Sequence, residues 1–292
     1  MTSHATNEIQ SQPEIWEQTI SFYPQVADLL PKPGERVAFV GCGTSWFMSM
    51  VVASLRETAS LGESDAFTAS EFPLNRKYDK IVAISRSGTT TEVVELLAKI
   101  TDTPTVIITA VAGSPVTEHA DETILLDFAD EESVLQTRYA TAVLVLMRTH
   151  FGEDITPLVD QCRAVLAEPL NEELLGVEQI AFLGTGWTVG LAHEAALKTR
   201  ESSQFWAEAY PAMDYRHGPI SIAQPGRATW IFGKPPVGLE KNIKDLGAMV
   251  ITSELDPMVH LVLAQRVAVA ISERRGLDTD NPRGLARSIV LN

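Results

Sequence analysis

The first half of the chain alternates short apolar runs with helical patterns. Apolar residues between Ile15 and Leu29 recur at helical spacing after Pro13, which predicts an opening helix. Strands are then expected at Val37–Val40, Lys80–Ile84, Thr105–Thr109 and Thr123–Leu126, and helices at Trp46–Leu55 and Glu92–Ile100. Strands that alternate with helices predict a parallel sheet covered on both faces.

The same pattern begins again in the second half. Val37–Gly43 is echoed by Ile180–Gly186, and each reads as a strand, a Gly-x-Gly turn and the start of a helix. This repeat predicts two related α/β domains, residues 1–155 and residues 156–292. Further elements are expected as helices at Pro157–Leu166, Ala192–Gln204 and Met258–Ile271, and as strands near Ala228–Phe232 and Ala248–Ile251.

Composition narrows the class of protein. The 292 residues are 45% hydrophobic, and 23 basic against 38 acidic residues give a net charge of −15. Such an acidic chain is not expected to bind nucleic acid, which needs a basic surface. It has no apolar run of membrane-spanning length and a polar start, so we expect a cytoplasmic protein with no membrane contact. Two cysteines provide neither a disulfide framework nor a metal cluster, and no metal or cofactor is predicted.

Hydroxyl residues gather where the second predicted strand opens into a helix. Five of the seven residues from Ser85 to Thr91 carry hydroxyls, and the other two are Arg86 and Gly88. Unpaired backbone N–H groups at a helix start, hydroxyl donors and a guanidinium together suit a phosphate dianion. Helix capping alone would need one hydroxyl, so the cluster favours an anion site.

The preceding strand ends in a similar turn, Gly41–Ser45. Thr44 and Ser45 could supply further donors from this neighbouring strand end, where parallel sheets usually bind ligands. Cys42 is a conceivable nucleophile, but a small buried residue in a tight turn is the favoured interpretation.

Two further segments carry candidate chemistry. Glu194, Lys198 and Glu201 fall on one helical face, where a carboxylate could remove a proton alpha to a carbonyl. The helix alone equally fits an ordinary solvated salt-bridge face. His217, before a Gly-Pro turn, is a catalytic candidate, although a lone histidine is more often structural.

In combination, these segments resemble the sugar isomerase (SIS) superfamily, specifically the isomerase half of glucosamine-6-phosphate synthase. The resemblance runs from about residue 15 to the end. Its landmarks are Gly41–Ser45, Ala69–Phe72, Ser85–Thr90, Glu194–Glu201, Ala207–Tyr210, His217–Pro219 and Asn281–Ser288.

The resemblance implies a fold and a set of site residues. The fold would be two SIS domains in tandem, each a flavodoxin-like three-layer sandwich with a parallel sheet flanked by helices, usually in homodimers. Glu201 would shuttle a proton, and His217 would open the sugar ring, reaching the site from the neighbouring subunit. Thr44, Lys198 and Arg287 are further substrate-site candidates. The substrate phosphate would lie at Ser45, Ser85, Arg86, Ser87 and Thr90.

Four departures from the synthase shape the functional prediction. No glutaminase domain is expected, because residue 2 is Thr rather than the nucleophilic Cys. The synthase's Schiff-base lysine falls on Arg287, and a protonated guanidinium does not form that imine. The second domain is also shorter between His217 and Arg283. In the phosphate loop Arg86 replaces the usual glutamine, which should strengthen anion binding.

These residues predict a phosphosugar aldose–ketose isomerase or an amino-sugar-6-phosphate deaminase. It would act on a hexose 6-phosphate such as glucosamine 6-phosphate, with proton transfer between C2 and C1. A fructosamine-6-phosphate deglycase would use the same proton chemistry, and a sugar-phosphate sensor without catalysis is the alternative outside enzymes.

Overall fold

The computed structural model describes residues 2–291 and divides them into two compact units. The first, called here the five-stranded unit, comprises Ser11–Glu132, Gln136–Val159 and the described residues from Ala286 onward. The second, the four-stranded unit, comprises the described residues up to Gln10, Ser133–Leu135 and Asp160–Leu285. The predicted boundary at residues 155 and 156 stays a prediction.

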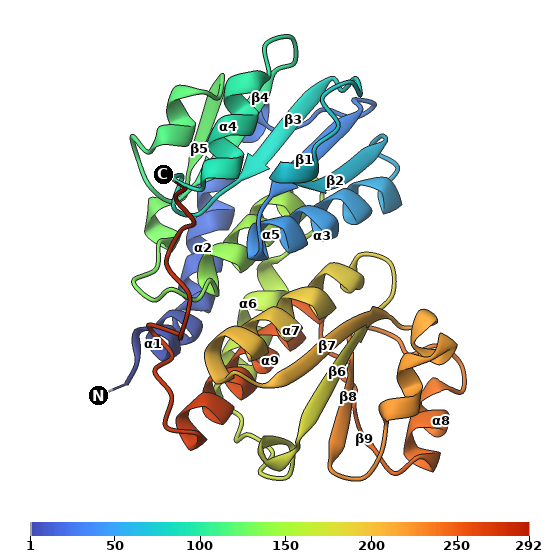
Figure 1. The fold of residues 1–292 in the computed structure, drawn as a ribbon. Coiled ribbons are helices and arrows are strands. Elements are labelled where there is room, and N and C mark those ends of the chain that lie inside the picture. The colour runs from blue at the N-terminus through green and yellow to red at the C-terminus, as the bar shows by residue number, and fades with distance from the viewer. Residues whose placement is uncertain (1, 292) are drawn as a thin grey trace. The chain divides into compact units, whose positions relative to one another are not determined.

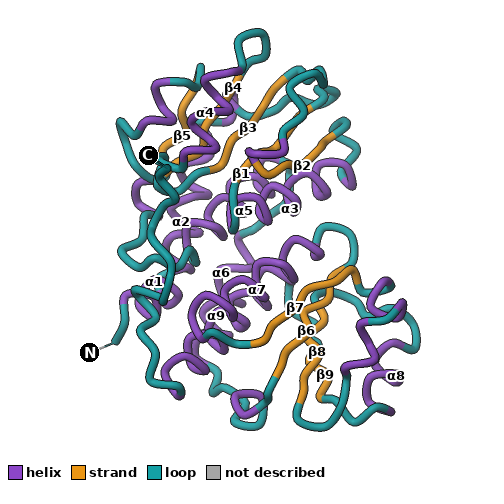
Figure 2. The backbone as a smooth tube through the Cα atoms, in the orientation of Figure 1, coloured by secondary structure: helices purple, strands orange, loops and turns teal. Residues whose placement is uncertain are grey.

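A parallel sheet in the order β2-β1-β3-β4-β5 forms the centre of the five-stranded unit (Figures 1 and 2). This strand order reverses direction between β1 and β3, as in doubly wound folds. The strands are β1 (Val37–Gly41), β2 (Ser64–Thr68), β3 (Lys80–Ile84), β4 (Thr105–Thr109) and β5 (Glu122–Leu125).

Helices cover both faces of this sheet. The crossover from β1 to β2 runs opposite to that from β3 to β4, and right-handed crossovers therefore put α3 (Thr44–Thr58) and α4 (Thr91–Lys99) on opposite faces. Val93, Leu96 and Leu97 of α4 pack onto Ala38, Val40 and Ile107 of the sheet. On the other side α3 packs against β1, β2 and α5 (Arg138–His150), which also contacts α2 (Gln12–Phe22).

The four-stranded unit has a second parallel sheet, in the order β7-β6-β8-β9 (Figure 2). Its core cluster joins this sheet to α8, while α7 packs against α9, and α9 against α1. Glu8 of α1 accepts hydrogen bonds from the backbone N and Oγ of Ser133. The strands are β6 (Gln179–Gly184), β7 (Trp206–Pro211), β8 (Arg227–Ile231) and β9 (Met249–Ile251), and the helices are α1 (His4–Gln10), α7 (Thr188–Ser203), α8 (Leu239–Asp245) and α9 (Pro257–Arg274).

The remaining elements connect these layers. The division between the units falls within α6 (Thr156–Ala167). Short 3-10 turns lie at Tyr23–Gln25, Ala27–Leu29, Ala69–Glu71, Pro115–Glu118, Asp127–Ala129, Leu174–Gly176, Asp214–His217 and Pro219–Ile222. In residues 2–291 no helix is long and apolar enough to cross a membrane.

A buried histidine lies among the aromatic residues of the four-stranded unit. The His260 ring centroid is 4.7 Å from that of Trp230 and 5.3 Å from that of Phe232. Its Nδ1 accepts a hydrogen bond of 3.3 Å from Trp230 Nε1. Burial lowers the pKa of His260 to about 3, so the ring is neutral in the folded protein at neutral pH.

This histidine should make the protein sensitive to acid. Below about pH 6.5 the unfolded chain binds a proton that the folded chain does not take up, so the free energy of unfolding falls by about 1.4 kcal/mol per pH unit. Between pH 6.5 and 5 the loss from His260 is about 2 kcal/mol. We expect His260→Gln to flatten the pH dependence of urea unfolding, and His119→Gln, at an exposed position, to leave it unchanged. Equal slopes for wild type and His260→Gln would contradict this account.

Candidate functional site

The candidate phosphate residues lie at the carboxyl ends of two adjacent strands. Ser45 belongs to the first turn of α3, which follows β1, and Ser85–Thr90 connects β3 to α4. Because β1 and β3 are parallel neighbours, both segments lie at the same edge of the sheet, where its strand order reverses. The structure therefore brings the predicted hydroxyl residues together in one unit.

Two glycines allow the backbone to turn this tightly. A Cβ on Gly41 would lie 2.5 Å from the carbonyl carbon of Ser45, so only glycine lets α3 begin so close to β1. Gly88 has a φ of +63°, and a Cβ there would lie 1.9 Å from Ser114 Oγ. A larger residue at either position would displace the strand-end loops.

Within the candidate phosphate loop, Ser85–Thr90, the side chains of Ser85 and Ser87 are buried. Ser87 Oγ accepts hydrogen bonds from the backbone N and Oγ1 of Thr89, at 3.3 and 3.1 Å. Thr90 directly precedes α4 and its side chain is half-buried. The loop thus presents hydroxyls at a helix N-terminus, an arrangement that suits an anion.

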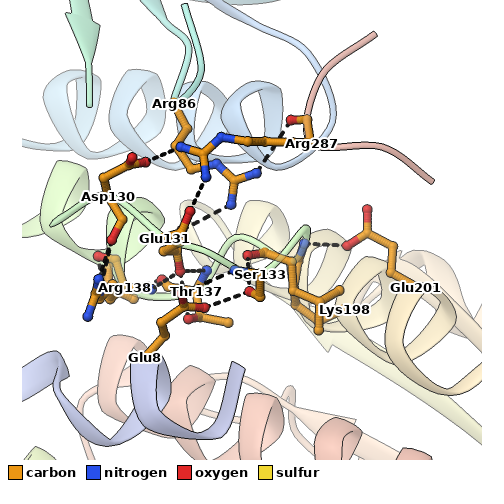
Figure 3. Close-up of polar contacts among 12 residues, drawn as sticks. Glu8, Arg86, Asp130, Glu131, Ser133, Thr137, Arg138, Lys198, Glu201 and Arg287 are labelled. Carbon is orange, nitrogen blue, oxygen red and sulfur yellow. Dashed lines mark hydrogen bonds and ion pairs between the residues drawn. The ribbon is translucent and has the colours of Figure 1, made fainter. Parts of the chain in front are cut away.

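Arg86 differs from these neighbours because its side chain turns into the protein (Figure 3). Both it and its partner Glu131 have 0% side-chain exposure, with Arg86 Nη1 3.5 Å from Glu131 Oε2. Arg86 Nη2 also donates to the carbonyl O of Arg287 at 3.4 Å. A carboxylate therefore already balances the guanidinium charge, and direct contact between Arg86 and phosphate stays a prediction.

Glu131 also caps a helix. Its Oε1 accepts hydrogen bonds from the backbone N and Oγ1 of Thr137, at 2.5 and 2.8 Å, and from the backbone N of Arg138 at 2.9 Å. These donors lie at the N-terminus of α5, where a carboxylate is favourable. One buried side chain thus connects the phosphate loop to the start of α5.

Arg287 contacts the same acidic segment. Its Nη2 lies 2.5 Å from Asp130 Oδ1, and its Nη1 donates to the carbonyl O of Glu131. The sequence analysis did not single out Asp130 or Glu131. Their signal in the sequence is a run of three acidic residues at 130–132, which by itself does not indicate that they lie beside the loop.

A second group of site candidates lies on α7 in the four-stranded unit. Lys198 Nζ donates to Glu201 Oε2 and lies 3.7 Å from Glu194 Oε1 (Figure 3 draws Lys198 and Glu201). Side-chain exposure is 0% for Glu194, 3% for Lys198 and 20% for Glu201. The three residues do share one face, but that face is buried, so the solvated salt-bridge alternative is wrong. Only Glu201 of the three reaches solvent appreciably.

His217 ends the 3-10 turn that follows β7, and it is exposed. Gly218 comes next with a φ of +143°, a conformation that favours glycine and turns the chain sharply. The catalytic role predicted for His217 stays a prediction.

Two further candidates, Cys42 and Thr44, lie in the turn and first helical residue after β1. Cys42 is half-buried, whereas the favoured interpretation predicts a buried residue. Desolvation still raises the pKa of its thiol, which disfavours the thiolate needed of a nucleophile. Thr44 is buried in the first turn of α3, next to Ser45. Among residues 2–291 no group of three His, Cys, Asp or Glu side chains is arranged to hold a metal ion.

Comparison with known families identifies part of this architecture. Residues 30–151, which lie almost entirely in the five-stranded unit, match the model of the SIS domain. This part of the chain is similar to the SIS domain. The match ends at residue 151, so it covers one such domain, and the prediction of two SIS domains in tandem was wrong. The four-stranded unit repeats the strand–turn–helix pattern of the SIS domain but lies outside the match.

Two curated relatives share the name glutamine–fructose-6-phosphate aminotransferase (isomerizing). The chain is 27% identical to glutamine–fructose-6-phosphate aminotransferase (isomerizing) of Pyrobaculum aerophilum over 342 residues, covering 95% of this chain and 57% of that protein. It is 25% identical to the Bacillus subtilis enzyme of that name, covering 97% of this chain and 58% of the relative. The chain therefore spans less than two thirds of these relatives.

Solved structures share the fold across almost the whole chain. Glucosamine-6-phosphate deaminase of Thermotoga maritima superposes with a TM-score of 0.82 at 24% identity, covering 99% of this chain and 100% of that one. Tagatose-6-phosphate ketose/aldose isomerase of Escherichia coli gives a TM-score of 0.79 at 19% identity, covering 98% and 97%. The arrangement of parallel sheets and flanking helices is thus shared with these proteins.

The buried Arg86–Glu131 pair should be important for stability. Glu131→Ala removes the counter-charge of a buried guanidinium and the cap of α5, so we expect a loss of about 3–5 kcal/mol in the free energy of unfolding. Glu131→Gln keeps an acceptor for the α5 N–H groups and should lose less. The half-exposed carboxylate of Asp130 offers a control, because Asp130→Ala should cost about 1 kcal/mol or less. Equal losses for Glu131→Ala and Asp130→Ala in urea unfolding would contradict the assignment.

Proposed function

We propose that the protein is a phosphosugar isomerase or amino-sugar-6-phosphate deaminase that acts on a hexose 6-phosphate, with glucosamine 6-phosphate as the first candidate. The observation that carries this proposal is the carboxylate of Glu201, which reaches solvent while the lysine that binds it is buried. A carboxylate oriented in this way is suited to accept a proton from a substrate carbon.

The phosphate is proposed to bind at the edge of the five-stranded sheet. Ser45, Ser85, Ser87 and Thr90 would donate hydroxyl hydrogen bonds, and the N-terminus of α4 would add its partial positive charge. Arg86 would contribute by fixing the loop rather than by adding net charge, because Glu131 neutralises it. Binding a phosphate remote from the reacting carbons supplies energy for orientation of the substrate.

Glu201 is proposed to move the proton. In the open-chain form of glucosamine 6-phosphate, the carboxylate would remove the proton from C2 and the resulting acid would deliver it to C1. Over the same steps the C1 oxygen would gain a proton and the C2 amine would lose one, so that C1 becomes CH2OH and the C2–N bond becomes an imine. Addition of water to this imine would release ammonia and leave fructose 6-phosphate. Lys198 would hold the Glu201 carboxylate, and His217 would assist ring opening by exchanging protons with the ring oxygen and the C1 hydroxyl.

No covalent intermediate with the protein is included in this proposal. The residue at the position of the synthase's lysine is Arg287, and its guanidinium is held by Asp130 and by the carbonyl O of Glu131. A guanidinium remains protonated at working pH and does not form an imine with a ketose. The absence of an imine-forming lysine at position 287 supports a mechanism in which the proton moves within the bound sugar and no bond forms between sugar and protein.

The direct test is incubation of purified protein with glucosamine 6-phosphate while ammonia and fructose 6-phosphate are followed together. We expect release of both in equal amounts and a loss of at least about 100-fold in kcat for Glu201→Gln, as for removal of a general base. Glu173→Gln, an exposed carboxylate in the same unit, is the matched control and should retain full activity.

Other outcomes distinguish the alternatives. Turnover of a fructosamine 6-phosphate but not of glucosamine 6-phosphate would establish a deglycase with the same proton chemistry. Binding of hexose phosphates without turnover of any, unaffected by Glu201→Gln, would contradict the enzyme proposal and favour a sugar-phosphate sensor.

A homodimer is part of the proposal, with His217 contributed by the partner subunit. The exposure of His217 supports this, because an exposed side chain can reach a second copy. We expect a mixture of the two inactive variants Glu201→Gln and His217→Ala to regain activity, since each mixed dimer would hold one intact site. No recovery after confirmed subunit exchange would rule out the shared site.

A further inference from the structure

A hollow opens on the surface of the four-stranded unit between α1 and α9, which are labelled in Figure 1. Its volume is about 450 Å³, a size typical of a small-molecule site. We call it the α1–α9 hollow, and its lining consists of Thr6, Ile9, Gln10, Leu170, Arg266, Val269, Ala270 and Glu273. These residues all belong to the four-stranded unit, and none of them is part of the proposed phosphate site or of the α7 cluster.

One face of α9 forms the length of the hollow. Four lining residues stand at positions i, i+3, i+4 and i+7 of this helix and therefore share that face: Arg266, Val269, Ala270 and Glu273. The two charged residues lie at the ends and the two apolar residues in the middle. Two helical turns, about 10 Å, separate the ends. Ile9 of α1 is buried and extends the apolar floor.

The other helix, α1, is a wall that is held in place. The carboxylate of Asp280 accepts hydrogen bonds from the backbone N of His4 and of Ala5, at 2.9 and 2.8 Å, at the start of α1. Glu8 accepts two more from Ser133. The hollow is therefore already formed before a ligand arrives, which lowers the ordering cost of binding.

Arg266 contributes a cation that has no carboxylate partner. Its Nη1 donates to the carbonyl O of Val165, and its Nη2 donates to the carbonyl O of Glu168 at 2.8 Å. These carbonyls fix the guanidinium without neutralising it, and among residues 2–291 it forms no ion pair. Desolvation lowers the pKa of Arg266, with the Glu168 carboxylate opposing this shift, and the group stays protonated at neutral pH. Its further N–H groups suit a carboxylate.

Glu273 contributes the opposite charge at the other end. Its side chain is exposed and has no hydrogen bond or ion pair within the described part of the chain. The next residue, Arg274, pairs with Glu172 instead. Thr6 and Gln10 add a hydroxyl and an amide to the lining. The hollow thus offers a cation and an anion at its two ends, with an apolar surface between them.

We propose that the α1–α9 hollow binds an extended zwitterion, a molecule whose carboxylate and ammonium are joined by several methylene groups. The carboxylate accepts hydrogen bonds from Arg266, the methylene groups cover Val269 and Ala270, and the ammonium donates to Glu273. The main chain of an α-amino acid is too short, because it carries both charges on one carbon while the ends of the hollow are about 10 Å apart. The expected chemical class is therefore that of the ω-amino acids.

This site is separate from the proposed catalytic carboxylate on α7. The opposite face of α9 contacts α7, where Ser202 Oγ donates to the carbonyl O of Ala268 at 3.2 Å and Ser272 Oγ donates to the carbonyl O of Ser202 at 2.6 Å. Ser202 directly follows Glu201 in the chain. A ligand in the hollow is therefore on the far side of α9 from Glu201, and its binding is measured without any reference to turnover.

The test is titration calorimetry of the full chain with 6-aminohexanoate. Hexanoate and hexylamine are matched ligands that each lack one charge, and glycine carries both charges on one carbon. We expect 6-aminohexanoate to bind at least about tenfold more tightly than any of the three, because each of them loses one charge-assisted contact or cannot make both at once.

Two variants locate the ligand. Glu273→Gln removes the exposed acidic end, so it should weaken binding of 6-aminohexanoate about tenfold and leave binding of hexanoate unchanged. Ala270→Met should fill the middle of the hollow and abolish binding of both. Glu254→Gln, at an exposed carboxylate elsewhere in the same unit, is the matched control and should bind as wild type.

The outcomes are decisive for the hollow and leave the proposed function untouched. Failure of wild type to bind 6-aminohexanoate would overturn the proposal, and so would equal affinity for hexanoate or hexylamine. Binding that neither Glu273→Gln nor Ala270→Met alters would place the ligand elsewhere and would overturn it as well. Turnover of glucosamine 6-phosphate is a separate measurement that bears on the proposed function alone.

Discussion

The buried ion pair between Arg86 and Glu131 is the interaction on which the candidate phosphate site depends. Burying two charged side chains without exposure lowers the free energy of unfolding unless the charges are paired and further hydrogen-bonded. Glu131 meets this requirement by capping α5, and Arg86 by contacting the carbonyl O of Arg287. One pair therefore fixes the phosphate loop, the start of a helix and the C-terminal segment relative to each other within the five-stranded unit.

The proposed proton-transfer chemistry uses buried charge in a similar way. On α7 a buried lysine lies between two carboxylates, of which one is fully buried and the other is partly open to solvent. The buried part of the cluster fixes the orientation of the open carboxylate, which is what a residue that accepts a proton from carbon requires. In each unit a buried charged side chain, Arg86 in one and Lys198 in the other, holds a polar group that is proposed to contact substrate.

Sequence patterns predicted the central strands well but missed two of the four edge strands. Lys80–Ile84 and Thr105–Thr109 were predicted with their observed bounds, because buried parallel strands are continuous apolar runs. β2 and β7 lie at sheet edges, are largely half-exposed and carry polar residues, and the patterns did not indicate them. The hydroxyl residues predicted an anion site at Ser85–Thr90, which stays a prediction. The direction of the Arg86 side chain depends on Glu131, 45 residues away along the chain, which local patterns do not reveal.

The central claim is that Glu201 carries a proton between C2 and C1 of a hexose phosphate. The most direct measurement is turnover of glucosamine 6-phosphate carrying deuterium at C2, with the fructose 6-phosphate formed examined by NMR. Deuterium at C1 in a single stereochemical position, or stereospecific uptake of a solvent proton there, is the predicted result, and Glu201→Gln should give neither. Recovery of glucosamine 6-phosphate with all of its deuterium at C2 and no fructose 6-phosphate formed, or unchanged transfer in Glu201→Gln, would contradict the account.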